Sequence, residues 1–573
     1  MNQDVFFKNF ELLADAPNGV QKLRELILQL AVMGKLVPQD PNDDPASVLL
    51  EKIKAEKKKL IKEGKSKGSK LISSKDADQI PYEIPSNWEW TTLSECGLIN
   101  PRNDISDEKE VSFIPMTCIS EKYGQKVEME IRKWEEIKKG FTHFAENDVV
   151  LAKITPCFQN GKSAVMKGLK NGFGAGTTEL HVFRPLKELI IPNFVLIYIK
   201  SPDFIYGGVP KMTGSAGQKR VPKDYFSENP FPLPPLAEQK RIVSKVDELM
   251  ALCDKLEARH QKKQEIQSKL NSAALERMLS AENKEEFEQY WQRICENFDL
   301  LYDNPENVEK LRQAILQLAV QGKLVPQNPE DEPASVLIEK IETEKKRCII
   351  SKEIQDDKKL STIMKENPPW IIPPSWKWIR LQEIFEITRG GSPRPAGDPQ
   401  YFGGNIPWIT VREITKDSEK YLTITTDFLT ELGSKRSRYI YPSDLLLTNS
   451  GATLGVPKIS QIKGCINDGV ARLNCFHDLI SKDYAYYYLF QQTRAFREVN
   501  QGMGQPNLNT SILAGWFFPL PPLNEQKRIV EKVEQFMGLC DELEAKLRKS
   551  REDSEKLMET VVRGLLEGAA TEI

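Results

Sequence analysis

Residues 20–53, VQKLRELILQLAVMGKLVPQDPNDDPASVLLEKI, recur at residues 308–341 as VEKLRQAILQLAVQGKLVPQNPEDEPASVLIEKI. The two stretches match at 26 of 34 positions, with an offset of 288 residues (308 − 20). IPSNWEW at 84–90 recurs as IPPSWKW at 372–378. PLPPLAEQKRIVSKVDELMALCDKLEA at 232–258 recurs as PLPPLNEQKRIVEKVEQFMGLCDELEA at 519–545. Self-similarity over such lengths indicates one unit written twice.

Between these blocks the two halves differ. Residues 91–229 and 379–516 have nearly equal lengths but little common sequence, apart from Gly217-Gln218 and Gly504-Gln505 near their ends. A constant frame with two unlike inserts of matched size indicates one architectural position with two different contents. We therefore predict five segments: a helical region at 1–83, an insert domain at 84–231, a central region at 232–371 (a long helix plus the repeated helices), a second insert domain at 372–518, and a C-terminal long helix at 519–573.

The repeated block predicts two short helices. Apolar residues of one face predict a helix over Val20–Met33, and Gly34 is a suitable C-terminal stop. Asp44 is predicted to cap the next helix, with Pro45 in its first turn. Asp331/Glu332 and Pro333 repeat the arrangement.

The third block predicts a long helix in each copy. Ile242, Val246, Leu249, Cys253 and Leu256 alternate by four and three, which is typical of a coiled-coil seam. The same register is predicted to resume at Leu270 and Ala274, and in the second copy it gives Ile529, Val533, Phe536, Cys540, Leu543, Leu547, Leu557 and Val561. Some 40 helical residues extend about 60 Å. The favoured interpretation is an antiparallel pair with internal pseudo-twofold symmetry. The alternative is that the helices join two copies of the chain.

Composition excludes several classes of protein. The longest apolar runs are too short to cross a membrane and the N-terminus does not resemble a signal peptide, so we expect a cytoplasmic protein. Nine cysteines without a CxxC pair and four histidines give neither a disulfide framework nor a metal site. The net charge of −2 does not rule out a local basic face.

The inserts read as mixed α/β domains, so the fold class is α+β with several domains. Asp148–Ile154 and Asp444–Thr448 are candidate strands, while Phe194–Lys200 and Tyr484–Gln492 are candidate helices. The tryptophans shared by both copies, Trp88, Trp90, Trp376 and Trp378, are predicted to be core anchors.

Several motifs carry a resemblance to a known family. They are the doubled LxxxILQLAVxGKLVPQ block, the doubled PLPPLxEQKRIV start, ITPCFQNGK at 154–162, GAGTTELHVFRP at 174–185, GNIPWIT at 404–410 and GQPNLN at 504–509. Over essentially its whole length the chain resembles the specificity subunits of Type I restriction-modification systems.

The resemblance implies a function as well as a fold. Each insert would be a target recognition domain that reads one half of an asymmetric, bipartite site in double-stranded DNA. The helical frame would set the gap and dock two methyltransferase (modification) subunits, through which two restriction subunits join. The chain itself would bind no cofactor; S-adenosylmethionine, ATP and Mg would belong to the partner subunits.

Two stretches imitate catalytic motifs. Asn367–Trp370 reads NPPW, a form found in amino-methyltransferases, but it aligns with residues 79–82 of the first copy and so marks the entrance to an insert. Gly161-Lys162-Ser163 resembles the end of a P-loop, but Pro156 occupies the position of the first glycine. We find no arrangement of nucleophile and base, and therefore predict no catalytic residues.

Residues with cationic or amide groups in glycine-rich or strand-following loops are the candidate DNA contacts. Arginine suits guanine, and asparagine or glutamine suits adenine. In the first insert they are Lys153, Gln159, Asn160, Lys162, Gln218, Lys219 and Arg220. In the second they are Arg389, Arg394, Arg412, Lys435, Arg436, Arg438, Asn449, Gln505, Asn507 and Asn509. For each of them a solvated loop or a turn-capping role is an equal alternative.

Two other functions remain open from the sequence. A stand-alone DNA-binding regulator with two domains would bind its site tightly without partners. A coiled-coil scaffold without a nucleic-acid role leaves the matched size of the unlike inserts unexplained.

Overall fold

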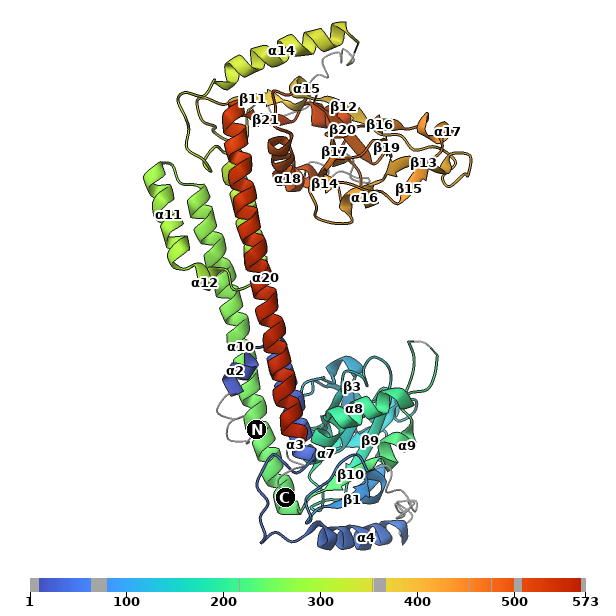
Figure 1. Ribbon diagram of the computed structural model, residues 1–573. Coiled ribbons are helices and arrows are strands. Elements are labelled where there is room, and N and C mark those ends of the chain that lie inside the picture. Colours follow the sequence, from blue (N-terminus) through green and yellow to red (C-terminus); the bar gives the residue numbers. More distant parts are fainter. Residues whose placement is uncertain are drawn as a thin grey trace. The chain divides into compact units, whose positions relative to one another are not determined.

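The computed structural model describes residues 10–62, 80–215, 217–352, 354, 367–451, 453–475, 477–498 and 508–567. The chain divides into two compact units: unit 1 comprises residues 1–264 and 550–573, and unit 2 comprises residues 265–549. Two long helices, α10 (Leu236–Leu279) and α20 (Leu523–Glu567), each contribute one part to unit 1 and another to unit 2 (Figure 1).

The frame of unit 1 contains the helices α2 (Phe10–Ala14), α3 (Gly19–Val32) and α4 (Ala46–Lys62). Of these, the amphipathic helix α3 provides most of the contacts described next. The predicted helix over 20–33 is thus confirmed. The apolar face of α3, including Leu23 and Ile27, shares one core with the first half of α10 and with the end of α20. The α10 residues of this core include the predicted seam of Ile242, Val246, Leu249, Cys253 and Leu256, all of which are buried.

Unit 2 repeats this frame with α12 (Phe298–Leu301), α13 (Pro305–Val320) and α14 (Ala334–Ile350), and α11 (Lys284–Glu296) precedes them without a counterpart among the described residues of unit 1. Here α13 shares cores with the end of α10, through Leu275 and Met278, and with the first half of α20, through Val533 and Cys540. The two long helices therefore run in opposite directions, as predicted. Because their seams are filled within the chain, the seams do not need a second copy. Burial raises the pKa of Cys253 to about 11 and also raises that of Cys540, which fits small apolar fillers.

The buried stripe departs from the predicted seam at one matched position of each long helix, although Val561, also predicted in the seam of α20, is buried. Leu270 and Leu557, which the sequence placed in the seam, are 47% and 57% exposed. Asn271 and Met558, one position further on, are fully buried instead. The predicted register was wrong at these positions.

The cause of the shift is helical geometry. An α-helix with 3.6 residues per turn drifts about 20° per heptad from a 3.5-residue repeat. Leu270 lies 28 residues beyond Ile242 (270 − 242), and Leu557 lies 28 beyond Ile529 (557 − 529). Over these four heptads the drift reaches about 80°, close to the rotation of about 100° between neighbouring residues. The buried stripe therefore moves to the next residue, at matched positions in both helices.

The turn after α3 and α13 needs a glycine. Gly34 and Gly322 have φ values of 70° and 71°. A Cβ atom at Gly34 would lie 2.5 Å from Cγ of Pro85, and one at Gly322 would lie 2.4 Å from Cγ of Pro373. Both positions confirm the predicted helix stop.

The start of the following helix differs from the prediction. Pro333 is itself the N-cap of α14, so Asp331 and Glu332 lie outside the helix. Asp331 instead pairs with Arg528 of α20 at 2.6 Å, and Asp43 pairs with Arg241 of α10 at 2.7 Å. α4 likewise begins at Ala46, one residue after Pro45, which leaves Asp44 in the exposed approach.

The insert of unit 1 folds into two four-stranded sheets and a short ribbon. The strands are β1 (Glu89–Thr92), β2 (Gly97–Ile99), β3 (Glu110–Ile114), β4 (Glu130–Lys133), β5 (Thr142–Ala145), β6 (Val149–Ala152), β7 (Ser163–Val165), β8 (Phe173–Gly176), β9 (Leu180–Pro185) and β10 (Pro230–Leu233). The helices are α5 (Leu93–Cys96), α6 (Trp134–Ile137), α7 (Pro192–Lys200), α8 (Pro202–Gly208) and α9 (Lys223–Glu228).

The insert of unit 2 has a similar set of elements. Its strands are β11 (Lys377–Arg380), β12 (Glu386–Arg389), β13 (Phe402–Ile409), β14 (Tyr421–Leu422), β15 (Asp427–Leu429), β16 (Arg438–Ile440), β17 (Leu445–Thr448), β18 (Pro457–Ser460), β19 (Gly464–Ile466), β20 (Val470–Asn474) and β21 (Phe517–Leu520). Its helices are α15 (Leu381–Ile384), α16 (Val411–Thr415), α17 (Glu431–Ser434), α18 (Lys482–Glu498) and α19 (Thr510–Ala514).

The two inserts share one topology despite their unlike sequences. The order β2-β9-β6-β7 in unit 1 corresponds to β12-β20-β17-β18 in unit 2, where β14 is added at the edge. The order β4-β3-β8-β5 corresponds to β15-β13-β19-β16, and the middle pair of each sheet, β3 with β8 and β13 with β19, is parallel. The candidate strands and helices of the inserts are confirmed as β6, β17, α7 and α18.

A two-stranded ribbon closes each insert where it meets the frame. β1 pairs with β10 and β11 pairs with β21, with Trp90 opposite Pro232 and Trp378 opposite Pro519. Trp88 and Trp376 are buried, and the indole N–H of Trp88 donates to Glu238 of α10 at 3.0 Å. The shared tryptophans are thus anchors of the insert on the frame, as predicted.

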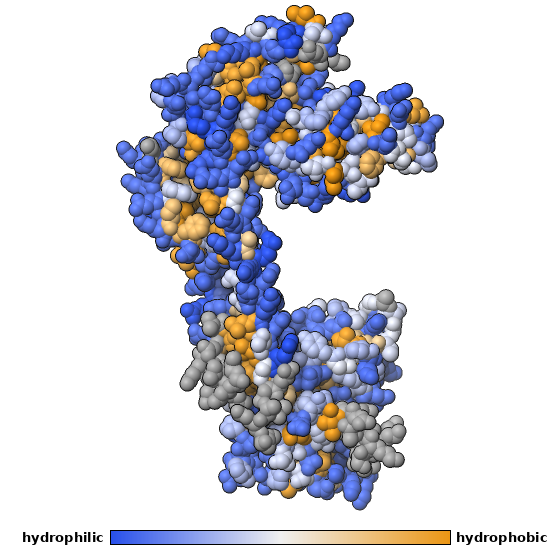
Figure 2. Space-filling model, viewed as in Figure 1, coloured by the Kyte–Doolittle hydropathy of each residue, from blue (hydrophilic) through white to orange (hydrophobic). Residues whose placement is uncertain are grey.

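Hydrophilic residues cover most of the face shown in Figure 2, and hydrophobic residues form scattered patches. Among the helices of the described residues, none is both long and apolar enough to span a bilayer.

Candidate nucleic-acid interface

In unit 1, three segments that are distant in sequence meet: the residues after β6, the turn between β8 and β9, and the loop before α9. The amide of Lys153 donates to the carbonyl of Glu179 at 2.9 Å, and that of Thr155 donates to the carbonyl of Lys219 at 2.9 Å. The amide of Val221 donates to the carbonyl of Lys153 at 2.8 Å. The structure therefore brings together three predicted residues, Lys153, Lys219 and Arg220; Gln218 lies in the same exposed loop. We call these segments loop cluster 1.

A carboxylate organises loop cluster 1. Arg220 donates from Nε and Nη2 to the two oxygens of Glu179, at 2.8 and 2.9 Å. The hydrogen bond from Arg220 lowers the pKa of Glu179, and Lys153 adds a smaller favourable charge. His181 lies beneath, where burial lowers its pKa to about 4, so that it is neutral at pH 7. Loop cluster 1 therefore places the cationic side chains of Lys153 and Arg220 close to the uncharged imidazole of His181.

The other candidates of this insert lie on the far side of the same loop. Gln159 and Asn160 are exposed, and they line a cavity of about 370 Å³ that Lys200 and Tyr206 also line. The buried ammonium of Lys200, whose pKa burial lowers to about 7, donates to the carbonyl of Gly161 at 2.7 Å and to that of Glu121 at 2.8 Å. Lys200 thus ties this loop to α7. Lys162 is half-buried beside the same turn.

Asn449 occupies in unit 2 the place of Lys153 in unit 1. Its amide donates to the carbonyl of Gly469 at 2.9 Å, and its carbonyl accepts from the amide of Leu508 at 2.8 Å. The side chain is only 1% exposed. Asn449 is therefore buried, and among the described residues its side-chain Oδ1 has no hydrogen-bond partner. A DNA contact by Asn449 stays a prediction.

Asp468 contacts two arginines of the second insert, Arg389 and Arg394. Its carbonyl accepts from Nε of Arg389 at 2.8 Å, and its carboxylate accepts from Oγ of Ser392 at 2.5 Å and lies 3.8 Å from Nη2 of Arg394. Arg436 donates to the carbonyl of Arg394 at 3.3 Å and stacks on Tyr401 at 4.5 Å. We call this set loop cluster 2.

The remaining candidates of the second insert are dispersed. Arg412 pairs with Asp427 at 2.9 Å on the β13–β15 side, and Lys435 follows α17. Arg438 starts β16, opposite Ile466 of β19 and so close to loop cluster 2. The side chain of Asn509 accepts from the amide of Ile512 and caps α19. Gln505 and Asn507 lie outside the described residues.

The catalytic look-alikes have structural explanations. The ring of Trp370 in the NPPW stretch lies 5.0 Å from that of Trp378, as the ring of Tyr82 lies 5.3 Å from that of Trp90, so both stretches pack at an insert entrance. Gly161-Lys162-Ser163 joins the antiparallel strands β6 and β7, so no helix N-terminus follows it. Within the described part of the chain no three His, Cys, Asp or Glu side chains gather as a metal site.

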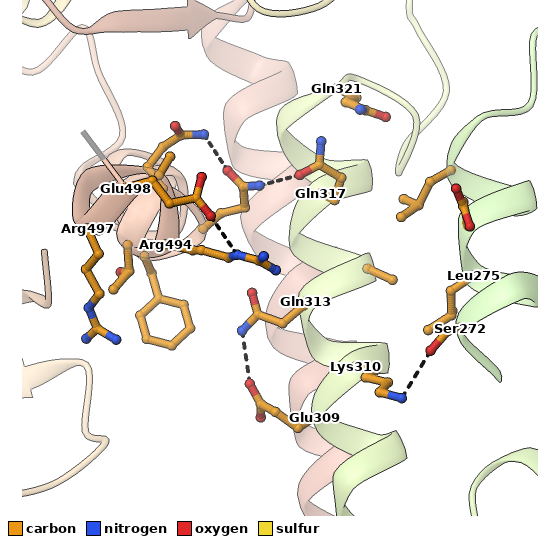
Figure 3. Close-up of a pocket in the computed structure, with 18 of the residues that line it drawn as sticks. Ser272, Leu275, Glu309, Lys310, Gln313, Gln317, Gln321, Arg494, Arg497 and Glu498 are labelled. Carbon is orange, nitrogen blue, oxygen red and sulfur yellow. Dashed lines mark hydrogen bonds and ion pairs between the residues drawn. The ribbon is translucent and has the colours of Figure 1, made fainter. Parts of the chain in front are cut away.

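A cavity of unit 2 lies where the insert meets the frame. It has a volume of about 1320 Å³ and is lined by α18, α13 and the end of α10 (Figure 3). Its polar groups bind one another: Lys310 donates to Ser272 at 3.1 Å, Gln313 to Glu309 at 2.9 Å, and Arg494 to Glu498 at 3.0 Å. This arrangement is typical of a packing interface and not of a small-molecule site.

Sequence reasoning missed the carboxylates that position the cations. Glu179 stands in the quoted motif GAGTTELHVFRP, and a search for acidic partners of Arg220 could have found it. Asp468 and Lys200 carry no such signal, because their roles depend on contacts between distant segments. The likeness of loop clusters 1 and 2 became visible only through the shared topology.

Comparisons with known proteins agree on one family. The profile described as "Type I restriction modification DNA specificity domain" matches residues 85–268 and 373–550. The chain is 40% identical over 542 residues to the Type I restriction enzyme EcoAI specificity subunit of Escherichia coli, covering 92% of this chain and 90% of the relative. It is 40% identical over 550 residues to the EcoEI specificity subunit of the same organism, covering 93% and 92%.

A solved structure supports the fold. A chain of a type I R-M system superposes with a TM-score of 0.52 at 20% identity, covering 85% of this chain and 99% of that chain.

Proposed function

Because this chain belongs to the family of Type I restriction-modification specificity subunits, we propose that each of its insert domains reads one half of a two-part target in double-stranded DNA. The observation that carries the proposal is the contrast between the inserts. They share a sheet topology, yet at equivalent edges one presents Lys153 and Arg220 and the other presents Arg389 and Arg394. One scaffold with two sets of surface groups suits two different half-sites.

The chemistry of the two loop clusters suits DNA. Lysines and arginines on phosphates fix the position of a reader, whereas guanidinium and amide groups at base edges select sequence. Glu179 holds the Arg220 fork with two hydrogen bonds. Asp468 lies 3.8 Å from Arg394 and offers that exposed guanidinium only a nearby opposite charge. Pre-orientation of the kind seen at Arg220 lowers the entropic cost of binding. The residues proposed to contact DNA are Lys153, Gln218, Lys219, Arg220, Arg389, Arg394, Arg436 and Arg438, with Gln159, Asn160, Lys162, Arg412, Lys435, Gln505, Asn507 and Asn509 at the periphery.

The frame serves assembly. We propose that the duplicated helices dock two modification subunits, that two restriction subunits join through them, and that α10 and α20 fix the gap between half-sites. In this complex the chain acts in the cytoplasm as a non-catalytic subunit. It binds no cofactor, and S-adenosylmethionine, ATP and Mg serve the partners.

The test compares the methylome of the source cells with and without this gene. We expect the loss of one bipartite adenine-methylation motif, restored by a plasmid copy. A methylome that loses no motif would contradict the proposal, provided that a modification subunit is expressed.

A purified chain that binds one DNA site tightly, without modification subunits, would favour a regulator instead. A purified chain that itself transfers methyl groups or cleaves DNA would contradict a non-catalytic role.

A further inference from the structure

Each insert touches its long helix at a second place, away from the ribbon at its base. In unit 2, Nζ of Lys420 lies 2.6 Å from a carboxylate oxygen of Glu534 on α20 and 2.8 Å from one of Asp483 on α18. The phenol of Tyr421 also donates to Asp483, at 3.1 Å. Three elements therefore meet here: the segment before β14, the first turn of α18, and α20.

Unit 1 has the same junction with different chemistry. The phenol of Tyr123, in the segment between β3 and β4, donates to Asp247 of α10 at 2.9 Å. Asn193, the second residue of α7, lies close enough to influence the phenol of Tyr123, and Asp483 is likewise the second residue of α18. The neighbouring Lys122 reaches Glu257 of α10 at 2.8 Å.

The two junctions are equivalent in position. Asp247 and Glu534 are separated by 287 residues (534 − 247), the offset that relates the two long helices. The insert residues that reach them, Tyr123 and Lys420, stand in regions without common sequence. Two diverged inserts thus meet the same position of the frame, each with a donor matched to a carboxylate.

The junction of unit 2 is well shielded. The side chain of Lys420 is 16% exposed, and its ammonium lies 4.9 Å from the ring of Tyr421 and 5.3 Å from that of Tyr487. Burial alone would disfavour the ammonium, but hydrogen bonds to Asp483 and Glu534 raise the pKa of Lys420. Removal of one partner would leave a half-buried charge without its full set of acceptors.

We propose that Tyr123 with Asp247, and Lys420 with Glu534, are positioning residues that fix the angle of each recognition domain on its long helix. A ribbon of two strands is a narrow attachment and permits rocking, whereas a second contact removes that freedom. This inference rests on the proposed function, since the angle matters only if the domains read two half-sites at a set gap. Loss of the junction should leave the recognised bases unchanged and loosen the requirement for the gap.

The experiment uses the full chain with Lys420→Met, Glu534→Gln and Tyr123→Phe, and Lys420→Arg as the conservative variant. Lys463→Met is the matched control, because Lys463 is an exposed lysine of the same insert, in the turn between β18 and β19 and outside both the junction and the proposed DNA contacts. Hydrogen–deuterium exchange is measured on each chain. We expect amides of residues 418–424 to exchange about tenfold faster in Lys420→Met and to return toward wild type in Lys420→Arg. Unchanged exchange in Lys420→Met would overturn the junction itself.

The second readout is methylation by the complex reconstituted with its modification subunits, on DNA targets with the native gap and with one base pair added or removed. We expect Lys420→Met to slow methylation at the native gap about fivefold. The ratio of the methylation rate at the native gap to the rates at the altered gaps should fall, while the same bases remain required. Faster exchange combined with an unchanged gap profile would overturn the positioning role. A wild-type complex without any sequence-specific methylation would mark a failure of the proposed function, and the exchange data would still decide whether the junction exists.

Discussion

Lys153 and Arg220 reach one surface from distant parts of the first insert, joined by main-chain hydrogen bonds and by Glu179. If Lys153 binds a phosphate, Lys153→Gln removes one charge contact. We expect the slope of log affinity against log salt concentration to fall by about 0.9 for the assembled complex. Lys167→Gln, at an exposed turn of the same insert, should leave the slope unchanged. An unchanged slope together with altered base preference would instead indicate that Lys153 reads a base.

Buried histidines make the fold sensitive to acid, and burial lowers the pKa of His143 among them. Burial lowers the pKa of His181 and of His477 to about 4 from an ordinary value of 6.5. Below pH 6.5 the unfolded chain therefore binds a proton at each of these histidines, whereas the folded chain binds it only near pH 4. The free energy of unfolding consequently falls as the pH decreases from 6.5 to 4. At pH 5 the loss is about 1–2 kcal/mol for each histidine. Thermal melting at pH 7 and pH 5 should show that His181→Gln reduces the drop. A drop as large as in the wild type would contradict the buried, neutral state.

At the scale of the element, the long helices offer a direct check of the shifted seam. Leu275 is buried in the core that joins α10 to α13, whereas Leu270 is half-exposed. Leu275→Ala should destabilise unit 2 by about 2–5 kcal/mol, because it leaves a cavity. Leu270→Ala should cost less than about 0.5 kcal/mol. Urea denaturation followed by circular dichroism compares the free energies of unfolding of the two variants. Equal decreases would contradict the burial of Leu275 in place of Leu270.

The frame could be predicted from sequence because its signals are local. The period of Leu23 and Ile27, the left-handed turn at Gly34 and the start of the seam at Ile242 each depend on neighbouring residues. The register at Leu270 could not be predicted, since a small drift per turn accumulates over many turns.

The inserts resisted prediction because their structure is non-local. Their parallel strand pairs join segments far apart in the chain, and the sequence holds no repeat between the two inserts to guide an alignment. The sequence singles out Arg220 and Arg389 as candidate DNA contacts, and that role stays a prediction. Their contacts with Glu179 and Asp468 could not be predicted, because each joins segments far apart in the chain. Its residue type makes Asn449 a candidate contact, yet the fold buries it.

At the scale of the whole molecule, duplication and divergence have separate roles. The duplicated parts, such as the Asp43–Arg241 and Asp331–Arg528 pairs, attach each unit to its long helix in the same way. The diverged parts lie within a shared topology and carry the groups that would distinguish one DNA half-site from another. An insert should therefore be exchangeable without disturbance of the other unit.

The most direct measurement is the methylome of cells in which residues 91–229 are replaced by the corresponding insert of another family member with a known motif. The account predicts that one half of the bipartite motif changes to that of the donor while the other half stays the same. A change in both halves, or in neither while methylation persists, would contradict the assignment of one insert to one half-site.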